Sequence, residues 1–216
     1  MKETITILAI DDEPLILEGL RGVLHKTFPE NKFYVARNFK IAQMLLQEHS
    51  IDLVLLDLDL NVSEQNGLDI APYLREHYPK AKIIVITVNV KIDYVEQLFD
   101  NGLVDGYLDK NFQLDILSQA IEQVMQGKTY LSEELQATIE RGRFYTLSNR
   151  EREVIELLTK GLTKKQIGYH LNLSPHSIDS HVRKLFEKLK VNTTQELVGK
   201  YVQYCTATTE NPNRKL

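Results

Sequence analysis

The chain has 216 residues, of which 43% are hydrophobic, so it is long enough for one large domain or two ordinary ones, and we expect two. A single cysteine, Cys205, excludes an internal disulfide, and its helical spacing from Val198 and Tyr201 predicts a buried apolar position. There is no apolar run of about eighteen residues and no basic N-terminal stretch followed by an apolar one. We therefore expect a cytoplasmic protein that has no membrane partner.

The net charge of −4 is unevenly distributed. Residues 1–145 carry 14 Lys and Arg against 23 Asp and Glu, whereas residues 146–204 carry 10 against 6. An acidic first part is repelled by polyanions and a basic second part is attracted to them. The pattern favours a nucleic-acid partner for the second part, although a charged run is usually a solvated face.

Short apolar runs rich in β-branched residues alternate with amphipathic stretches in the first half of the chain. The apolar runs predict strands at 4–10, 33–36, 53–57, 83–87 and 105–108. The amphipathic stretches predict helices at 15–26, 41–48, 68–77, 93–101 and 114–125. The third and fourth strands are apolar without alternation, as strands covered on both faces must be. The pattern predicts an α/β fold, a flavodoxin-like doubly wound five-stranded parallel sheet of order 2-1-3-4-5.

Charged residues follow three of these predicted strands. Asp11 and Asp12 follow the first, Asp57 the third and Lys110 the fifth. Parallel sheets place their chemistry at the carboxyl ends of the strands, so these side chains are expected to meet. Three converging carboxylates repel one another unless a cation lies among them, and an all-oxygen site suits Mg²⁺. A lysine nearby indicates an anion that binds and leaves, and the simplest is a phosphoryl group.

The segment 127–145 differs from what precedes it, because glycines at 127 and 142 flank one short polar stretch. We interpret it as a linker with a helical turn or two. It separates a predicted first domain at 1–126 from a second at 146–204, and 205–216 is a polar tail.

The second domain is predicted to be a small all-α helix-turn-helix. Ser148 and Glu151 form a capping box, Thr163 caps a short helix, and Ser174 before Pro175 opens a longer one. A last helix near 194–205 has an apolar stripe that could close the core or bind a second copy, and core is favoured.

The helix that begins at Pro175 has one apolar and one polar face. Its apolar face consists of Ile178, Val182, Leu185, Phe186 and Leu189. Its polar face offers partners for phosphates and base edges, as a helix in the major groove requires. The candidate DNA-binding residues are Lys164, Lys165, Ser177, Ser180, His181, Arg183, Lys184 and Lys188.

Four segments of the chain resemble a known family. The runs IDLVLLDLDL, KIIVIT and DGYLDK resemble a response-regulator receiver domain. A fourth segment is similar to the LuxR-type helix-turn-helix, namely LSNREREVIELLTKGLTKKQIGYHLNLSPHSIDSHVRKLFEKLKV. Together they resemble the NarL/FixJ family of two-domain response regulators, from residue 4 to about 204.

The resemblance implies a role for each site residue. Asp57 would accept a phosphoryl group from a sensor histidine kinase or a small phosphodonor, and Thr87 and Lys110 would contact that group. Tyr107 would change rotamer. The implied Mg²⁺ ligands are Asp11, Asp12, Asp57 and the main-chain carbonyl of Asp59.

The resemblance also implies the output. Phosphorylation would switch the second domain, as a homodimer, to bind double-stranded DNA and regulate transcription. The protein would not be an enzyme beyond slow removal of its own phosphoryl group.

Three features depart from the family pattern. The nine residues LDLNVSEQN between Asp57 and Gly67 form a longer loop, and Val88 stands where a small residue is more common. Asp179 lies in the predicted recognition helix, where it could accept from a cytosine amino group or pair with Arg183. We favour the pair with Arg183.

Two other functions remain open. LLDLDL also resembles the aspartate-x-aspartate motif of haloacid-dehalogenase-type phosphatases, in which Asp57 would be the nucleophile and Asp59 a general acid. Alternatively, the second domain acts through protein contacts only. Phosphatase turnover tests the first alternative, and salt-dependent binding to duplex DNA tests the second.

Overall fold

The computed structural model describes residues 4–60, 66–88, 90–111 and 114–210. The chain divides into two compact units, Met1–Gln136 and Ala137–Leu216, and each has a hydrophobic core of its own. Within the described ranges no helix is both long enough and apolar enough to cross a membrane.

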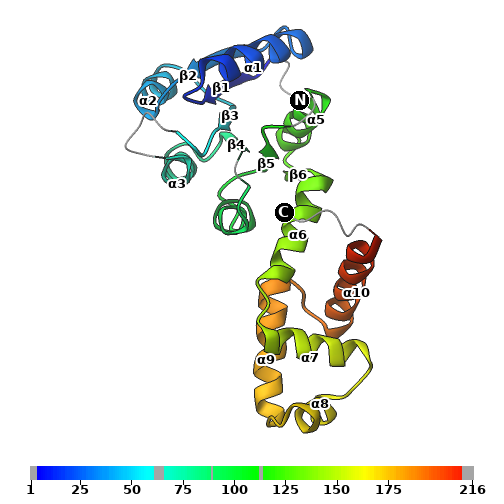
Figure 1. Cartoon of the computed structure of the whole chain (residues 1–216). Coiled ribbons are helices and arrows are strands. Elements are labelled where there is room, and N and C mark those ends of the chain that lie inside the picture. The colour runs from blue at the N-terminus through cyan, green and yellow to red at the C-terminus, as the bar shows by residue number, and fades with distance from the viewer. Residues whose placement is uncertain (1–3, 61–65, 89, 112–113, 211–216) are drawn as a thin grey trace. The chain divides into compact units, whose positions relative to one another are not determined.

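The first unit is built on a parallel sheet (Figure 1). Its strands are β1 (Thr6–Ile10), β2 (Lys32–Ala36), β3 (Leu53–Leu56), β4 (Lys82–Thr87), β5 (Gly106–Asp109) and β6 (Tyr130–Leu131). Across the described residues the order is β2-β1-β3-β4-β5-β6, so the predicted order 2-1-3-4-5 is confirmed. The predicted number of five strands was one too few, because β6 has two residues and is too short to show an apolar pattern.

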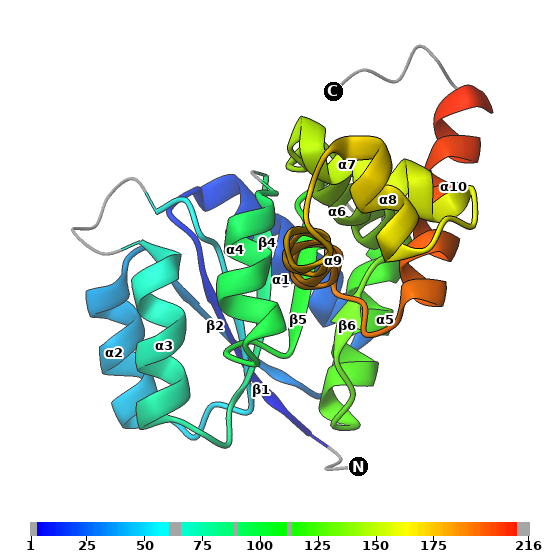
Figure 2. The same cartoon turned by 90° about the horizontal axis from the view of Figure 1, so that it is seen from below.

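Helices cover both faces of this sheet. They are α1 (Pro14–Thr27), α2 (Phe39–Glu48), α3 (Gly67–His77), α4 (Ile92–Val95) with a π-helical turn η1 (Glu96–Asp100), and α5 (Leu114–Met125). The apolar residues of α1 and α5 share one core with alternate residues of the strands. On the other face α2 and α3 lie side by side, where the rings of Phe39 and Tyr73 meet edge to face (Figures 1 and 2). Burial on both faces explains the uninterrupted apolar strands.

The second unit is helical, and its last four helices begin where the sequence predicts. They are the C-terminal part of α6 (Glu133–Tyr145), then α7 (Asn149–Thr159), α8 (Lys164–Leu171), α9 (Pro175–Leu189) and α10 (Thr194–Glu210). The Ser148 capping box is formed, and the side chains of Thr163 and Ser174 cap α8 and α9. On α9 the predicted apolar face is buried except Phe186, which packs against the core while partly exposed.

The segment 127–145 is more regular than a linker with a helical turn or two. It contains β6 and the 13 residues of α6. Tyr130 joins the core of the first unit and Phe144 joins that of the second. The composition of the segment did not predict this arrangement, because most of its residues are polar and its core-forming side chains lie near its two ends.

The predicted burial of Cys205 is wrong, since the residue is exposed. Val198, Tyr201 and Tyr204 pack against the core at successive spacings of three residues. The ring of Tyr204 stacks on Phe144 with centroids 4.2 Å apart. Residue 205 therefore lies beside the apolar stripe of α10 rather than within it.

Candidate functional site

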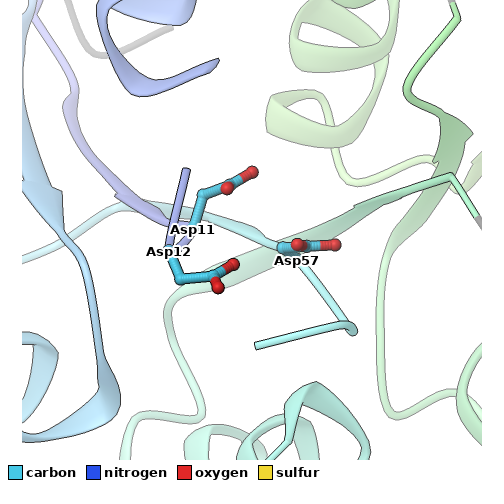
Figure 3. Close-up of side chains that lie close together, drawn as sticks. All are labelled: Asp11, Asp12 and Asp57. Atoms are coloured by element: carbon cyan, nitrogen blue, oxygen red, sulfur yellow. The ribbon is translucent and has the colours of Figure 1, made fainter. Parts of the chain in front are cut away.

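The acidic cluster forms because β1 and β3 are neighbours in register. Ile10 pairs with Leu56, and the backbone N–H of Asp57 donates to the Ile10 carbonyl at 2.9 Å. The next residue of each strand, Asp11 and Asp57, therefore emerges at the same edge. One carboxylate oxygen from each of Asp11, Asp12 and Asp57 lies within 4.8 Å of the others (Figure 3).

Lys110 joins this cluster from the end of β5. Its backbone N–H donates to the Thr87 carbonyl at 2.8 Å, which anchors it beside β4. Its Nζ lies 2.8 Å from Asp11 Oδ2 and 2.8 Å from Asp57 Oδ2, with Glu13 Oε1 at 3.8 Å. The predicted convergence of Asp11, Asp12, Asp57 and Lys110 is thus present.

Burial and charge act against each other at this site. Burial raises the pKa of Asp57, and the hydrogen bond from Lys110 offsets this only in part. Burial alone would lower the pKa of Lys110, but Asp11 and Asp57 raise it by more. Lys110 is therefore a charged ammonium. The ionised form of Asp57, which burial disfavours, would be stabilised by further positive charge.

The residues fit a divalent cation. Asp57 Oδ1 is buried and has no hydrogen-bond partner among the described residues. A buried carboxylate oxygen without a donor is costly, and a cation among the three acids would relieve this cost. The donors are all oxygen, which Mg²⁺ prefers to zinc-type nitrogen and sulfur ligands.

Thr87 lies at the end of β4 and is fully buried. Its hydroxyl donates to Asp59 Oδ2 at 3.3 Å. This contact between the two side chains was not predicted from the sequence, which pointed to the main-chain carbonyl of Asp59 as a metal ligand and to its side chain only as the general acid of a phosphatase. No local pattern predicts it, because Asp59 lies beyond the end of β3 and Thr87 is 28 residues away on β4.

Tyr107 lies in β5, paired with Val85, and is fully buried. Its hydroxyl has no hydrogen-bond partner among the described residues, and burial raises its pKa. A buried phenol without a partner is unfavourable. A rotamer in which the Tyr107 hydroxyl is hydrogen-bonded would remove this unfavourable contribution.

The structure describes only part of the two features near Asp57 that differ from the family pattern, the longer loop and Val88. Residues 61–65 of the longer loop lie outside the described residues. Val88 is 55% exposed, so its side chain does not fill the core. The loop returns at Gly67, where an added Cβ would lie 2.4 Å from the Asp57 carbonyl oxygen.

The predicted DNA-binding residues lie on α8 and α9, the two helices of the helix-turn-helix. Exposed residues are Lys164, Lys165, Ser180, Arg183 and Lys184, and partly buried ones are Ser177, His181 and Lys188. Lys188 differs from the rest, because its Nζ lies 2.8 Å from Glu151 Oε2 and 3.2 Å from the Thr146 carbonyl oxygen. Glu151 is the buried acid of the capping box, so Lys188 is held within the fold of its own unit.

The favoured pairing of Asp179 with Arg183 is wrong as the main contact. Asp179 Oδ1 instead accepts from Lys164 Nζ at 2.6 Å. The partner is 15 residues away on α8, and helical spacing alone gives no information on contacts between helices.

Comparisons with known proteins agree with this architecture. Residues 7–122 match the response regulator receiver domain family and residues 145–200 match the bacterial regulatory proteins of the luxR family. The nitrate/nitrite response regulator NarP of Escherichia coli K12 is 32% identical over 195 residues, covering 87% of this chain and 89% of NarP. NarL of the same strain is 30% identical over 206 residues, covering 90% and 94%.

Solved structures show the same fold. Salmonella typhimurium RcsB superposes with a TM-score of 0.63 at 23% identity, covering 93% of this chain and 98% of that one. A structure of two RcsB dimers bound to two parallel DNAs gives 0.61 at 22% identity, covering 92% and 98%.

The two matched families together cover most of both units. Neither family is an enzyme family, and the match that includes Asp57 and Asp59 is to a receiver rather than a phosphatase. The chain belongs to the NarL/FixJ family of response regulators, which join a receiver domain to a LuxR-type DNA-binding domain and act as transcription factors.

Proposed function

We propose that Asp57 is the phosphoacceptor, and that its phosphorylation switches the second domain to bind DNA. The observation that carries this proposal is the state of the Asp57 carboxylate. Lys110 holds Oδ2 at 2.8 Å, whereas Oδ1 is buried without a donor among the described residues. Lys110 fixes one oxygen, and the carboxylate keeps lone pairs available both for a cation and for a new bond to phosphorus.

The acidic cluster would hold Mg²⁺ through Asp11, Asp12 and Asp57, with the main-chain carbonyl of Asp59. When bound, the ion supplies the positive charge that allows a carboxylate and an anionic phosphoryl donor to approach each other. Lys110 contributes a second positive charge, since it already contacts Asp11 and Asp57.

In the transfer, a carboxylate oxygen of Asp57 attacks phosphorus and forms an acyl phosphate. The bond from phosphorus to the donor atom breaks, and the donor keeps the electron pair. The donor is the phosphohistidine of a sensor histidine kinase or a small acyl phosphate. Asp57 cannot provide a proton for a leaving imidazole when it is ionised, so that proton comes from water or the kinase.

The new group changes the partners of the residues around it. Its oxygens accept from Lys110 and from the Thr87 hydroxyl, which must leave Asp59 to reach them. Tyr107 would then change rotamer, which repacks the surface around β4 and β5. The added charge thus shifts an equilibrium between two arrangements of the surface around β4 and β5.

The output is binding of a homodimer to double-stranded DNA through α8 and α9. The exposed basic residues on these helices and the RcsB dimers solved on DNA support this proposal. Phosphorylated protein should bind duplex DNA with an affinity that falls steeply as salt rises. Binding that ignores salt would instead favour a module that acts through protein contacts.

The test of the phosphoacceptor is intact-protein mass after incubation with acetyl phosphate and Mg²⁺. Wild type should gain one phosphoryl group, and Asp57→Asn should gain none. Asp69→Asn, an exposed acid on α3, is the matched control and should behave as wild type. A gain that persists in Asp57→Asn would move the acceptor elsewhere, and repeated hydrolysis of p-nitrophenyl phosphate would favour the phosphatase alternative.

A further inference from the structure

An exposed ion pair joins the two helices of the helix-turn-helix. Lys164 is the first residue of α8, Asp179 is the fifth of α9, and Lys164 Nζ lies 2.6 Å from Asp179 Oδ1. The two side chains are 49% and 47% exposed. Both therefore keep polar atoms accessible, and the described residues donate no hydrogen bond to Asp179 Oδ2.

Stability is a weak reason for this pair, because exposed ion pairs contribute little to folding. The charge of Asp179 is also unusual for its place. It lies one turn from His176 and one turn from Arg183, on a helix whose exposed side is otherwise basic or neutral near its start. An isolated carboxylate there would be repelled by DNA phosphates, and the charge of Lys164 opposes that repulsion.

Asp179 remains an acceptor at neutral pH. The hydrogen bond from Lys164 lowers its pKa, and the nearby His176 and Arg183 act in the same direction. Its neighbours are less available, since the Ser180 hydroxyl donates to the His176 carbonyl at 3.2 Å. The hydroxyls of Ser174 and Ser177 bind each other at 2.8 Å.

The pair matches the edge of one base pair. In the major groove a C·G pair presents the cytosine N4 donor beside the guanine O6 acceptor, which are hydrogen-bonded to each other at about 2.9 Å. Asp179 and Lys164 present an acceptor beside a donor at a similar 2.6 Å. The residues near the start of a recognition helix are those that contact base edges.

An A·T pair also presents a donor beside an acceptor, but its flanking groups differ. Adenine N7 would repel the carboxylate, and the thymine methyl group would meet the ammonium. Guanine N7 instead gives the ammonium a second acceptor, and cytosine has no acceptor on that side. The arrangement therefore discriminates in favour of C·G.

We propose that Lys164 and Asp179 act as one base-recognition unit that selects a C·G pair in each half-site, with the carboxylate on cytosine and the ammonium on guanine. This inference rests on the proposed DNA binding of α8 and α9. It makes both residues specificity-determining, and it makes the bridge the device that orients them.

The test uses the full chain phosphorylated with acetyl phosphate, selection from a randomised duplex library, and anisotropy titration of the enriched sites. Wild type should enrich one C·G pair per half-site and lose about tenfold in affinity when that pair is changed. Asp179→Asn and Lys164→Met should reduce this preference to near onefold. Lys165→Met, the matched exposed lysine, should weaken binding to all sites alike and keep the preference.

The charge-swapped double variant Lys164→Asp/Asp179→Lys gives a second, independent outcome. It preserves the bridge and the net charge while exchanging donor and acceptor, so the preferred pair should invert from C·G to G·C. Circular dichroism of each variant checks that the helices are retained.

Two results would overturn the inference while leaving DNA binding intact. These are an enriched site whose base preferences are unchanged in Asp179→Asn, or a swapped variant that still selects C·G. Wild type that enriches no site and shows no salt-dependent binding would instead overturn the proposed function, and this inference with it.

Discussion

At the scale of single residues, Gly67 shows how closely α3 approaches the acceptor. A Cβ at this position would lie 2.4 Å from the Asp57 carbonyl oxygen and 2.6 Å from the Leu58 Cα. Both atoms are backbone, so neither can rotate away. The loop that follows Asp57 must therefore return to α3 through a residue without a side chain.

We expect Gly67→Ala to destabilise the first unit by about 1–3 kcal/mol, as overpacking does. It should also slow phosphorylation, because the backbone beside Asp57 must move. Gly19→Ala, in α1 where an added Cβ meets nothing within 4 Å, is the control and should stabilise by about 0.5–1 kcal/mol. Urea unfolding and the rate of acetyl phosphate labelling measure both effects, and equal stability changes would contradict the argument.

Asp105, outside the acidic cluster, makes a pH-dependent contribution to the stability of the first unit. It accepts from Arg75 at 2.7 Å, from Lys82 at 2.8 Å and from the backbone of Ile83 at 3.0 Å. Burial alone would raise the pKa of Asp105, but these donors together lower it below the ordinary value. The native state therefore stays deprotonated at a pH where the unfolded state binds a proton.

The free energy of unfolding of the first unit should consequently fall as the pH falls through this lowered pKa. The contribution is present above the ordinary aspartate pKa of about 3.9 and is lost below it. Asp105→Asn should make this part of the pH profile flatter and cost about 3 kcal/mol at neutral pH, because Arg75 and Lys82 lose their counter-charge. A profile as steep as that of wild type would assign the acid sensitivity to other carboxylates.

At the scale of elements, the start of α7 joins local and tertiary interactions in one place. Ser148 and Glu151 cap each other as the sequence predicts, and Lys188 of α9 adds an ion pair to the same glutamate. Lys188, predicted to bind DNA, thus contacts an acid on its own unit. The exposed Lys184 on the same helix is the natural comparison.

We expect Lys188→Met to lower the stability of the second unit by about 1–3 kcal/mol, since Glu151 would remain buried without its counter-charge and keep only its hydrogen bonds with Ser148. Lys184→Met should leave stability within about 0.5 kcal/mol and reduce the slope of log affinity against log salt by about one. Urea unfolding and DNA titrations at several salt concentrations compare the two. A Lys188 variant that keeps full stability and loses salt dependence would restore the original prediction.

At the scale of the whole molecule, each unit has its own core, and the acidic cluster belongs to the first alone. We expect two calorimetric transitions. Mg²⁺ should raise the transition temperature of the first unit only, because binding adds about 2.7 kcal/mol to its free energy of unfolding at a hundredfold excess over the dissociation constant. Asp12→Asn should reduce this stabilisation by Mg²⁺. Ser148→Ala should instead lower the transition temperature of the second unit, because loss of the cap costs about 1 kcal/mol of stability. A single transition, or two that respond equally to Mg²⁺, would show that the units do not unfold separately.

The sequence by itself determined the order of strands β1 to β5, the starts of helices α7 to α10 and the convergence of Asp11, Asp12, Asp57 and Lys110. These follow from short-range rules: apolar periodicity, caps, and the fact that parallel strands end at one edge. Only the tertiary structure decided the Thr87 contact with Asp59, the place of Lys188 beside Glu151 and the bridge from Lys164 to Asp179. Each of these joins segments from 15 to 37 residues apart, and such contacts depend on how elements pack, which no local pattern encodes.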